Sequence, residues 1–532
     1  MGVDPRCDSC REKLQKPEHT RVHLSAGCES GQNRIMQLTR SSGILLHPTS
    51  LPGRYGIGDL GPAAHDWIEA LAETGTGLWQ LLPLGPTGYG DSPYQCFSAF
   101  AGNPYLVSPD LLLTDGLLIA ADLAELPDLR NEAVDYGTVI PFKLGLLDRA
   151  FARSSDLDLE DDLQRFRERH AGWLTDFGLF MALKDIHDGE PWWTWEADLR
   201  DRKQAALDRT RSRYTDLIHR HIFRQFLFFR QWEQIREKAA RCNVRIIGDL
   251  PIFVAEDSAD VWSHRHLFAL DDEGRPTVIA GVPPDYFSPT GQLWGNPLYR
   301  WEVHKETGYA WWLDRLRAVL DLVDVVRLDH FRGFAAYWEV PGGEDTAETG
   351  RWVEGPGAGF LEAVAAEFGQ PPIIAEDLGE ITPDVIELRD RFELPGMKIL
   401  QFAFDSGETN DFLPHRYPEH CVVYTGTHDN DTTRGWFESA GDDDKAFALE
   451  YLGVDGQNYA WDLIRAAWES RAAWAVTTMQ DVLDLGTEAR MNFPSVPAGN
   501  WRWRMTEGSF SPELRARFRQ LNETAGRSAS GD

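Results

Sequence analysis

The stretch VVRLDHFRG, residues 325–333, joins a predicted buried strand to a cluster of charged side chains. Its valines and leucine form a nearly continuous apolar run, which is typical of a strand buried on both faces. Arg327, Asp329 and His330 would then crowd the C-terminal end of that strand. Neighbouring positive charge favours the ionised form of a carboxyl group, as a carboxylate nucleophile requires. By itself such a cluster is more often a structural ion pair than a catalytic site, so the remaining sequence decides between the two.

Strand signals recur along the chain in a pattern that predicts a parallel barrel. A strand, a helix over residues 62–74 and a second strand follow one another early in the chain, and this is the unit of parallel sheets. The eight predicted strands cover residues 43–48, 78–84, 244–250, 325–328, 372–379, 397–402, 421–426 and 489–493. They favour an α/β fold, a closed (β/α)8 TIM barrel. A doubly wound sheet is the alternative, but no Gly-rich phosphate loop follows the first strand.

The spacing of these strands also predicts how the chain is divided. We expect residues 1–36 to be a disordered or misannotated leader, and residues 37–532 to form a catalytic barrel without a separate C-terminal β domain. Residues 85–243 interrupt the series with charge-rich stretches of helical spacing, which predicts a mostly helical insertion after the second strand. Residues 255–324 are predicted to be a loop insertion that supplies a lid and substrate loops at the barrel mouth.

Charge and hydropathy limit the classes of partner. A formal net charge of −31 and a pI near 4.9 disfavour binding to nucleic-acid phosphates or to an anionic membrane surface. No run approaches the about 18 apolar residues of a membrane span, and the first residues lack an apolar signal core. We therefore expect a soluble, cytoplasmic protein with a neutral substrate and no nucleic-acid or membrane partner.

The six cysteines are too sparse for a disulfide framework in a chain of this length. Cys7 and Cys10, followed by His19, His23 and Cys28, resemble the ligands of a zinc site. The gap from cysteine to histidine is shorter than in a zinc finger, and few apolar residues are present to pack around the metal. We therefore predict no metal site in this segment.

Three carboxylates follow predicted strands and would meet at one end of the barrel. Asp329 follows the fourth strand, Glu376 the fifth and Asp429 the seventh. Barrel enzymes keep their active sites at the C-terminal ends of the strands. Three acids on three separate strands are hard to explain as structural pairs, because desolvating charges is costly.

Acids at a barrel mouth serve either a divalent metal or glycoside chemistry. A metal site would gather carboxylates without a competing arginine, yet Arg327 lies two residues from Asp329. A retaining glycosidase needs one ionised and one protonated carboxyl group about 5 to 5.5 Å apart. Asp329 fits the ionised partner. Glu376 fits the proton donor, because its apolar neighbours and nearby acids should raise its pKa.

Several long motifs closely resemble amylomaltase, the 4-α-glucanotransferase or disproportionating enzyme of the α-amylase clan. They are GYGDSPYQCFSAFAGNPYL (88–106), GDLPIFVAEDSADVW (248–262), AGVPPDYFSPTGQLWGNPLYRW (280–301), RLDHFRGF (327–334), IIAEDLGEITPDV (373–385), YTGTHDNDT (424–432) and RMNFPSVPAGNWRWR (490–504). The resemblance covers residues 37–505, with the motifs in the family's order. The chain departs from the family at residues 196–197, where Pro is expected, and at Ser495, where Gly is common.

The resemblance implies a role for each acid and a set of glucan contacts. Asp329 would be the nucleophile, Glu376 the acid/base and Asp429 a third carboxylate that holds sugar hydroxyls. The stretch 281–288 resembles the family's flexible lid. The implied substrate-binding residues are Tyr89, Tyr94, Asp285, Tyr286, Phe287, Trp294, Asn296, Arg327, His330 and His428. No organic cofactor and no metal are implied.

We therefore predict a 4-α-glucanotransferase that moves α-1,4-glucan segments between maltooligosaccharide or amylose chains, or to glucose. An α bond formed from an α bond requires two inversions, hence a covalent β-glycosyl intermediate on Asp329. One alternative is a retaining α-glucan hydrolase with the same acids, in which water resolves the intermediate. The other is a non-catalytic glucan-binding barrel, which predicts a missing acid, whereas all three are present.

Overall fold

A computed structural model describes residues 38–284 and 288–529, and its centre is a ring of eight parallel strands. The strands are β1 (Ser41–Leu45), β2 (Leu78–Gln80), β3 (Arg245–Pro251), β6 (Val325–Asp329), β9 (Ile373–Ala375), β10 (Gly396–Ile399), β11 (Cys421–Tyr424) and β12 (Trp474–Thr478). Their order is β10-β11-β12-β1-β2-β3-β6-β9. The ring nearly closes where the Ala375 N–H donates to the Pro395 carbonyl at 2.9 Å. The predicted TIM barrel is confirmed.

The inside of the barrel is packed with apolar side chains from every strand. A single buried cluster takes one residue or more from each: Leu45, Leu78, Ile247, Val325, Ile374, Ile399, Val422 and Val476 are members. A second cluster on the outer faces of the strands packs against the surrounding helices. The strand Val325–Asp329 is therefore buried on both faces, as its apolar run predicts.

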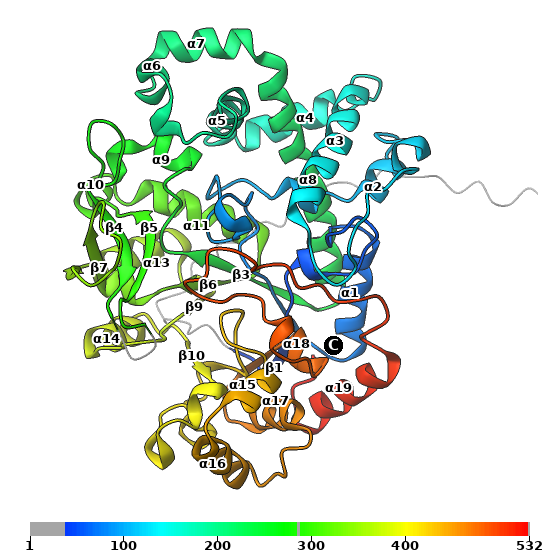
Figure 1. The fold of residues 1–532 in the computed structure, drawn as a ribbon, viewed down its shortest axis with the longest axis vertical. Helices are drawn as coiled ribbons and strands as arrows, with labels where there is room; N and C mark the ends of the chain where they lie inside the picture. Colours follow the sequence, from blue (N-terminus) through cyan, green and yellow to red (C-terminus); the bar gives the residue numbers. More distant parts are fainter. Residues whose placement is uncertain (1–37, 285–287, 530–532) are drawn as a thin grey trace, which may run out of the picture. The chain divides into compact units, whose positions relative to one another are not determined.

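Helices surround the barrel and also form a large insertion between β2 and β3 (Figure 1). Those of the insertion are α2 (Pro109–Thr114), α3 (Tyr136–Ser154), α4 (Glu160–Arg169), α5 (Leu174–Ile186), α6 (Ala197–Arg200), α7 (Gln204–Arg213) and α8 (Thr215–Arg241). The others are α1 (Pro62–Glu73), α9 (Ala259–Ser263), α10 (Trp301–Glu306), α11 (Ala310–Leu322), α12 (Arg332–Ala335), α13 (Gly357–Phe368), α14 (Pro383–Arg391), α15 (Thr433–Ser439), α16 (Asp442–Leu452), α17 (Tyr459–Glu469), α18 (Met479–Val482) and α19 (Pro512–Thr524). Figure 1 shows α3 to α7 gathered at the top of the view and α15 to α19 at the bottom.

A small antiparallel sheet was not predicted. Its order is β5 (Gln292–Pro297), β4 (Val278–Val282), β7 (Ala336–Pro341) and β8 (Arg351–Glu354). The sequence analysis assigned the first two strands to loops, because Pro and Gly surround short apolar runs there and weaken the strand signal. This sheet borders the segment that contains residues 285–287, which lie outside the described residues.

The predicted eighth strand was placed wrongly. Residues 489–493 form no strand, and the eighth position in the barrel belongs to β12, which pairs with β1 and β11. The β12 sequence, WAVTT, is completely buried but follows α17 within a run rich in Ala and Trp. A short apolar run next to a helix cannot be assigned to strand or helix by periodicity alone.

A buried arginine links the C-terminal segment to the end of α17 through hydrogen bonds. The Arg527 guanidinium is fully buried and donates to the carbonyls of Trp468, Ser470, Ala472, Ala473 and Ser41 at 2.7–3.3 Å. The last carbonyls of a helix have no partner within the helix, and a positive charge there is also favoured by the helix dipole.

We predict that Arg527→Ala lowers the free energy of unfolding by about 3 kcal/mol or more, because several buried carbonyls lose a charged donor. The matched control is Arg519→Ala on α19, which removes one half-exposed pair with Glu73 and should cost less than about 1 kcal/mol. Denaturant midpoints of the two variants test this difference. Equal midpoints would show that the hydrogen bonds of Arg527 do not stabilise the fold.

Candidate active site

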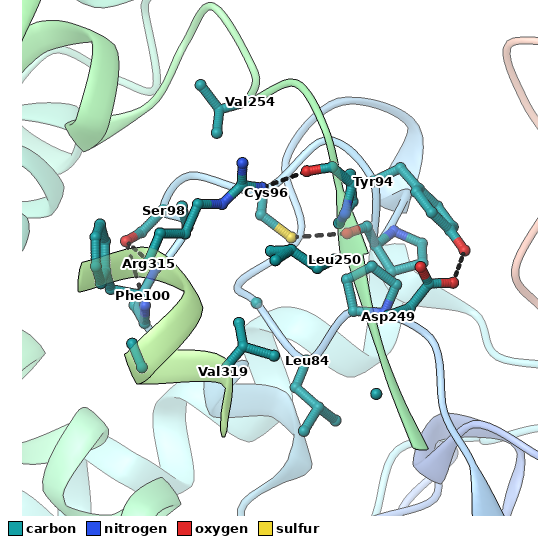
Figure 2. Close-up of a pocket in the computed structure, with 18 of the residues that line it drawn as sticks. Leu84, Tyr94, Cys96, Ser98, Phe100, Asp249, Leu250, Val254, Arg315 and Val319 are labelled. Atoms are coloured by element: carbon teal, nitrogen blue, oxygen red, sulfur yellow. Dashed lines mark hydrogen bonds between the residues drawn. The ribbon is translucent and has the colours of Figure 1, made fainter. Parts of the chain in front are cut away.

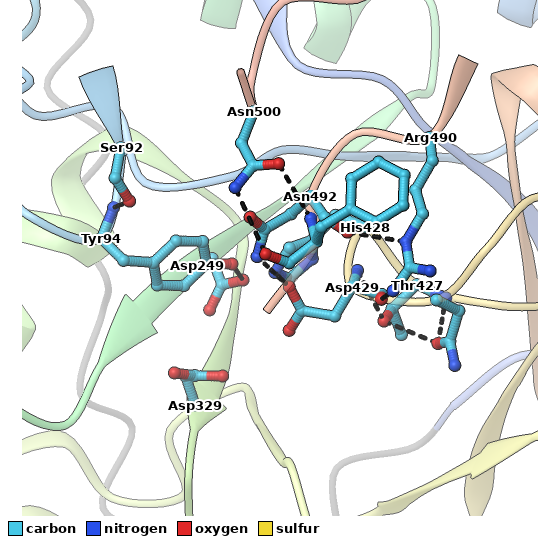
Figure 3. A network of polar contacts seen from close by, with 12 residues as sticks. Ser92, Tyr94, Asp249, Asp329, Thr427, His428, Asp429, Arg490, Asn492 and Asn500 are labelled. Carbon is cyan, nitrogen blue, oxygen red and sulfur yellow. Dashed lines mark hydrogen bonds and ion pairs between the residues drawn. The ribbon is translucent and has the colours of Figure 1, made fainter. Parts of the chain in front are cut away.

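The barrel brings the three predicted carboxylates to one end of the strands. Asp329 is the last residue of β6, Glu376 directly follows β9, and Asp429 lies in the loop after β11. Figure 3 shows Asp329 and Asp429 within one polar network, together with Tyr94, Asp249 and His428. Parallel strands place their C-terminal ends at a common edge, so residues far apart in the sequence meet there.

Arg327 is buried between two carboxylates. Its Nη1 lies 2.8 Å from Asp329 Oδ1, and 2.9 and 2.7 Å from Asp249 Oδ1 and Oδ2. Burial lowers the pKa of the Arg327 guanidinium, but Asp249 and Asp329 outweigh that effect and the net pKa is raised well above its ordinary value. Arg327 therefore stays charged between the two carboxylates.

Asp249 is a site residue that the sequence analysis missed. It lies near the end of β3, directly opposite Arg327 in the strand register, and its side chain is completely buried. It also accepts a hydrogen bond from the Tyr94 hydroxyl at 2.7 Å. The rule that found the three acids, a polar residue at a strand end, applies equally to Asp249 and could have found it.

Glu376 is buried and its pKa is raised. Burial raises the pKa to about 8, and the charge of Asp329 acts in the same direction, while Arg327 opposes both. The backbone N–H groups of His330 and Leu378 donate to its two oxygens at 2.6 and 3.1 Å. These bonds fix the carboxyl group beside Asp329. Burial thus shifts one of the two neighbouring carboxyl groups toward its protonated form, while the other is ion-paired with Arg327.

His330 adopts a left-handed backbone conformation, with φ of 52°. This conformation is unfavourable for a residue with a side chain, and it directs the His330 N–H at Glu376. Burial lowers the pKa of the imidazole to about 4, so the ring is neutral near pH 7. Its Nε2 is buried and has no hydrogen-bond partner within residues 38–284 and 288–529. Trp294 meets the ring edge-on, with centroids 4.7 Å apart.

Asp429 is held by residues from a later loop. Its Oδ1 accepts from Asn492 Nδ2 at 2.7 Å and lies 3.4 Å from His428 Nε2, while its backbone carbonyl accepts from Arg490 at 2.6 Å (Figure 3). About half of its side chain remains exposed, so it can contact a ligand. The sequence analysis missed Asn492 and Arg490 because it placed them in a strand.

Tyr94 and His428 form a stacked aromatic wall. Their ring centroids are 5.1 Å apart with an interplanar angle of 15°, and Trp501 packs against both rings. The Tyr94 hydroxyl donates its hydrogen to Asp249, which fixes the orientation of the ring. This wall and Trp294 supply apolar surfaces beside the acids, which is how proteins bind the C–H faces of sugars.

The other predicted contact residues lie in different surroundings. Asn296 is buried, and its amide already bonds Val254 and Gln95 at 2.8 and 3.3 Å. Tyr89 is 75 % exposed. The predicted contacts Asp285, Tyr286 and Phe287 lie outside the described residues.

A small cavity lies beside β3, with Tyr94 and Asp249 among the residues that line it (Figure 2). It measures about 70 Å³ and is lined mainly by apolar residues such as Leu84, Leu250 and Val319. Its volume is far below the about 300 Å³ of the smallest ligand pockets.

Among residues 38–284 and 288–529, no group of three or more His, Cys, Asp or Glu side chains is arranged to hold a metal ion. The cysteines and histidines of residues 7–28 lie outside this part of the chain. No helix within it is long and apolar enough to cross a membrane.

Comparisons with known proteins agree with this geometry. A family model described as 4-alpha-glucanotransferase matches residues 46–510. The chain is 52 % identical to the 4-alpha-glucanotransferase of Thermus thermophilus over 503 residues, 92 % of this chain and 100 % of that one. It is 49 % identical to the 4-alpha-glucanotransferase of Synechocystis sp., with 92 % and 98 % of the two chains covered.

A solved structure extends the match to three dimensions. The amylomaltase from Streptococcus agalactiae, determined in complex with acarbose, superposes with a TM-score of 0.90 and 37 % sequence identity. The match covers 92 % of this chain and all of that one. The family model, the relatives and the fold agree over most of the length, and the chain therefore belongs to the 4-alpha-glucanotransferase family.

Proposed function

We propose that this 4-α-glucanotransferase works by a retaining double displacement with Asp329 as nucleophile and Glu376 as acid/base. The observation that carries this proposal is a pair of carboxyl groups at neighbouring strand ends, of which one is ion-paired and the other is buried with a raised pKa. Asp329 is paired with the buried Arg327 at 2.8 Å, while burial raises the pKa of Glu376 to about 8. One ionised and one protonated carboxyl group are what retaining glycoside chemistry requires.

In the first step, an oxygen of Asp329 attacks C1 of a glucose unit, and the bond from C1 to the glycosidic oxygen breaks. Glu376 gives its proton to that oxygen, which leaves as the 4-hydroxyl of the released chain. In the second step, the 4-hydroxyl of an acceptor attacks C1 and the bond to Asp329 breaks. The acceptor's proton passes to Glu376, which restores the starting state.

Asp429 and His330 would stabilise the reacting sugar. The exposed half of the Asp429 carboxylate can accept bonds from sugar hydroxyls, while Asn492 fixes its orientation. The His330 ring, which meets Trp294 edge-on, is a further proposed contact to the sugar. Hydrogen bonds that strengthen as the ring flattens toward an oxocarbenium ion lower the barrier.

The proposed donors and acceptors are maltooligosaccharides and amylose, with glucose as the smallest acceptor. Tyr94 and Trp294 offer ring surfaces to the glucose units, the buried His428 supports the Tyr94 ring, and Arg327 orients the nucleophile. Tyr89, Asp285, Tyr286, Phe287 and Asn296 remain proposed contacts on the basis of the family resemblance. The acceptor hydroxyl competes with water, which is present at about 55 M. Because well-oriented groups reach effective molarities of about 10⁵ M or more, a positioned acceptor can react ahead of water.

We predict that Asp329→Asn lowers turnover of maltotriose by about 10⁴-fold or more, and Glu376→Gln by about 10²- to 10⁴-fold. Asp429→Asn should cost about 10²- to 10³-fold, because it weakens hydrogen bonds that act in the transition state. Glu380→Gln is the matched control, since Glu380 is an exposed acid only four residues from Glu376. Glucose release and circular dichroism are measured together. Near-normal turnover by a folded acid variant would refute the role of that acid.

We also predict that the alkaline side of the pH profile of kcat/KM depends on the leaving group. Glu376 must be protonated to act as acid, so kcat/KM for maltotriose should fall about tenfold per pH unit above its pKa of about 8. With α-maltotriosyl fluoride the departing fluoride needs little acid assistance, so this alkaline fall should be absent. An alkaline fall that is the same for both donors would contradict Glu376 as the proton donor.

A further inference from the structure

Asp481 is a buried acid that the proposed mechanism does not use. It lies on α18, which directly follows β12, and the residue is only 1 % exposed. Burial raises the pKa of its carboxyl group, and the hydrogen bonds that oppose this rise come from Thr425, Thr433 and Thr478. A buried acid is costly unless its oxygens are bonded, so these partners show what the residue does in the fold.

The hydrogen bonds of Asp481 join the two ends of one loop. Thr425, the first residue after β11, donates its hydroxyl to Oδ2 at 2.6 Å. Thr433, the first residue of α15, donates its hydroxyl to Oδ2 at 2.8 Å and its backbone N–H to Oδ1 at 2.7 Å. The loop between these two threonines carries His428 and Asp429. One buried side chain therefore holds both ends of the loop that supplies the third carboxylate.

Between its two ends, this loop is braced by bonds of its own. The Thr427 N–H and hydroxyl both donate to Asn430 Oδ1 at 2.9 Å. The Asp429 N–H donates to the Thr427 hydroxyl at 3.3 Å (Figure 3). Gln401 Nε2 also donates to the Asp431 carbonyl at 2.9 Å. Because closely packed and bonded groups transmit a displacement, a shift at the ends of the loop would reach Asp429.

The groups around Asp481 require a side chain with two acceptor oxygens. Two hydroxyls and one backbone N–H converge on it, and an ionised carboxyl group can accept a bond from each of them. An Asn side chain has nearly the same shape, but an NH₂ group replaces one of the oxygens. Asp481→Asn therefore weakens the attachment of the loop without opening a cavity.

We propose that Asp481 is a positioning residue for the transfer reaction, which places Asp429 by holding both ends of its loop. The inference rests on the proposed role of Asp429 in that reaction. Asn492 fixes the Asp429 carboxylate at 2.7 Å, and Asp481 fixes the backbone that carries it. Asp481 is too deeply buried to contact a sugar, so it acts through the loop. A misplacement of about 1 Å can cost about 10²-fold in rate.

The test is a double-mutant cycle in which fluoride release from α-maltotriosyl fluoride is measured. We expect Asp481→Asn to lower kcat by about 10- to 100-fold in the otherwise unchanged chain. In the Asp429→Asn background it should lower kcat by less than about threefold, because the group that it misplaces is already impaired. A merely structural role would lower kcat by the same factor in both backgrounds.

Variants of Thr425 test the same attachment and do not depend on the folding of Asp481→Asn. Thr425→Val removes the hydroxyl at similar size and should lower kcat about 3- to 10-fold, as for one lost hydrogen bond. Thr425→Ser keeps the hydroxyl and should restore kcat to within about twofold.

The matched control is Asp484→Asn. Asp484 also lies just after α18 and also contacts the start of α15, since Arg434 Nε donates to it at 3.0 Å, but this pair is largely exposed. Its loss should change kcat by less than about twofold.

An unchanged kcat in Asp481→Asn, or an equal loss in the two backgrounds, would overturn the proposal. Failure of the proposed function would be seen separately, in the Asp429→Asn variant alone. Near-normal fluoride release by that variant would refute the role of Asp429, and the inference about Asp481 would fall for that reason.

Discussion

The active site depends on the buried guanidinium of Arg327. A charge in the protein interior is tolerated only when it is paired, and Arg327 is paired with Asp249 on one side and Asp329 on the other, at 2.7–2.9 Å. The strand register produces this arrangement, because Asp249 on β3 lies directly opposite Arg327 on β6. Asp249 completes the charge balance of Arg327, and Arg327 in turn orients Asp329 through their ion pair.

Burial has a different consequence for Glu376, which follows the neighbouring strand. Glu376 follows β9, the other strand paired with β6, but it has no arginine of its own. Burial therefore raises its pKa to about 8, and the charge of Asp329 adds to the rise. One buried site thus holds an ion-paired carboxylate and a carboxyl group of raised pKa side by side. His330 directly follows Asp329, and its left-handed backbone conformation lets its N–H donate to Glu376. This bond holds the two carboxyl groups in place relative to each other.

The parts that could be predicted from sequence are those set by local patterns. Apolar runs such as that of β6 identify buried strands, and polar residues at their ends identify Asp329 and Glu376. The strand β12 was missed because its Ala- and Trp-rich run resembles the helix before it. Asp249 satisfied the same strand-end rule, but its importance lies in a contact with Arg327 across 78 residues of sequence. The support of Asp429 by Asn492 likewise depends on where a distant loop folds back, which no local pattern encodes.

The central claim is that Asp329 forms a covalent bond to the glucan, and trapping that bond tests it most directly. The Glu376→Gln variant would be mixed with α-maltotriosyl fluoride, which reacts without acid assistance but leaves the second step without a base. Peptide mass spectrometry after quenching should find one maltotriosyl group on the peptide that contains Asp329. An adduct on another acid, or formation of β-anomeric transfer products without any adduct, would contradict the account.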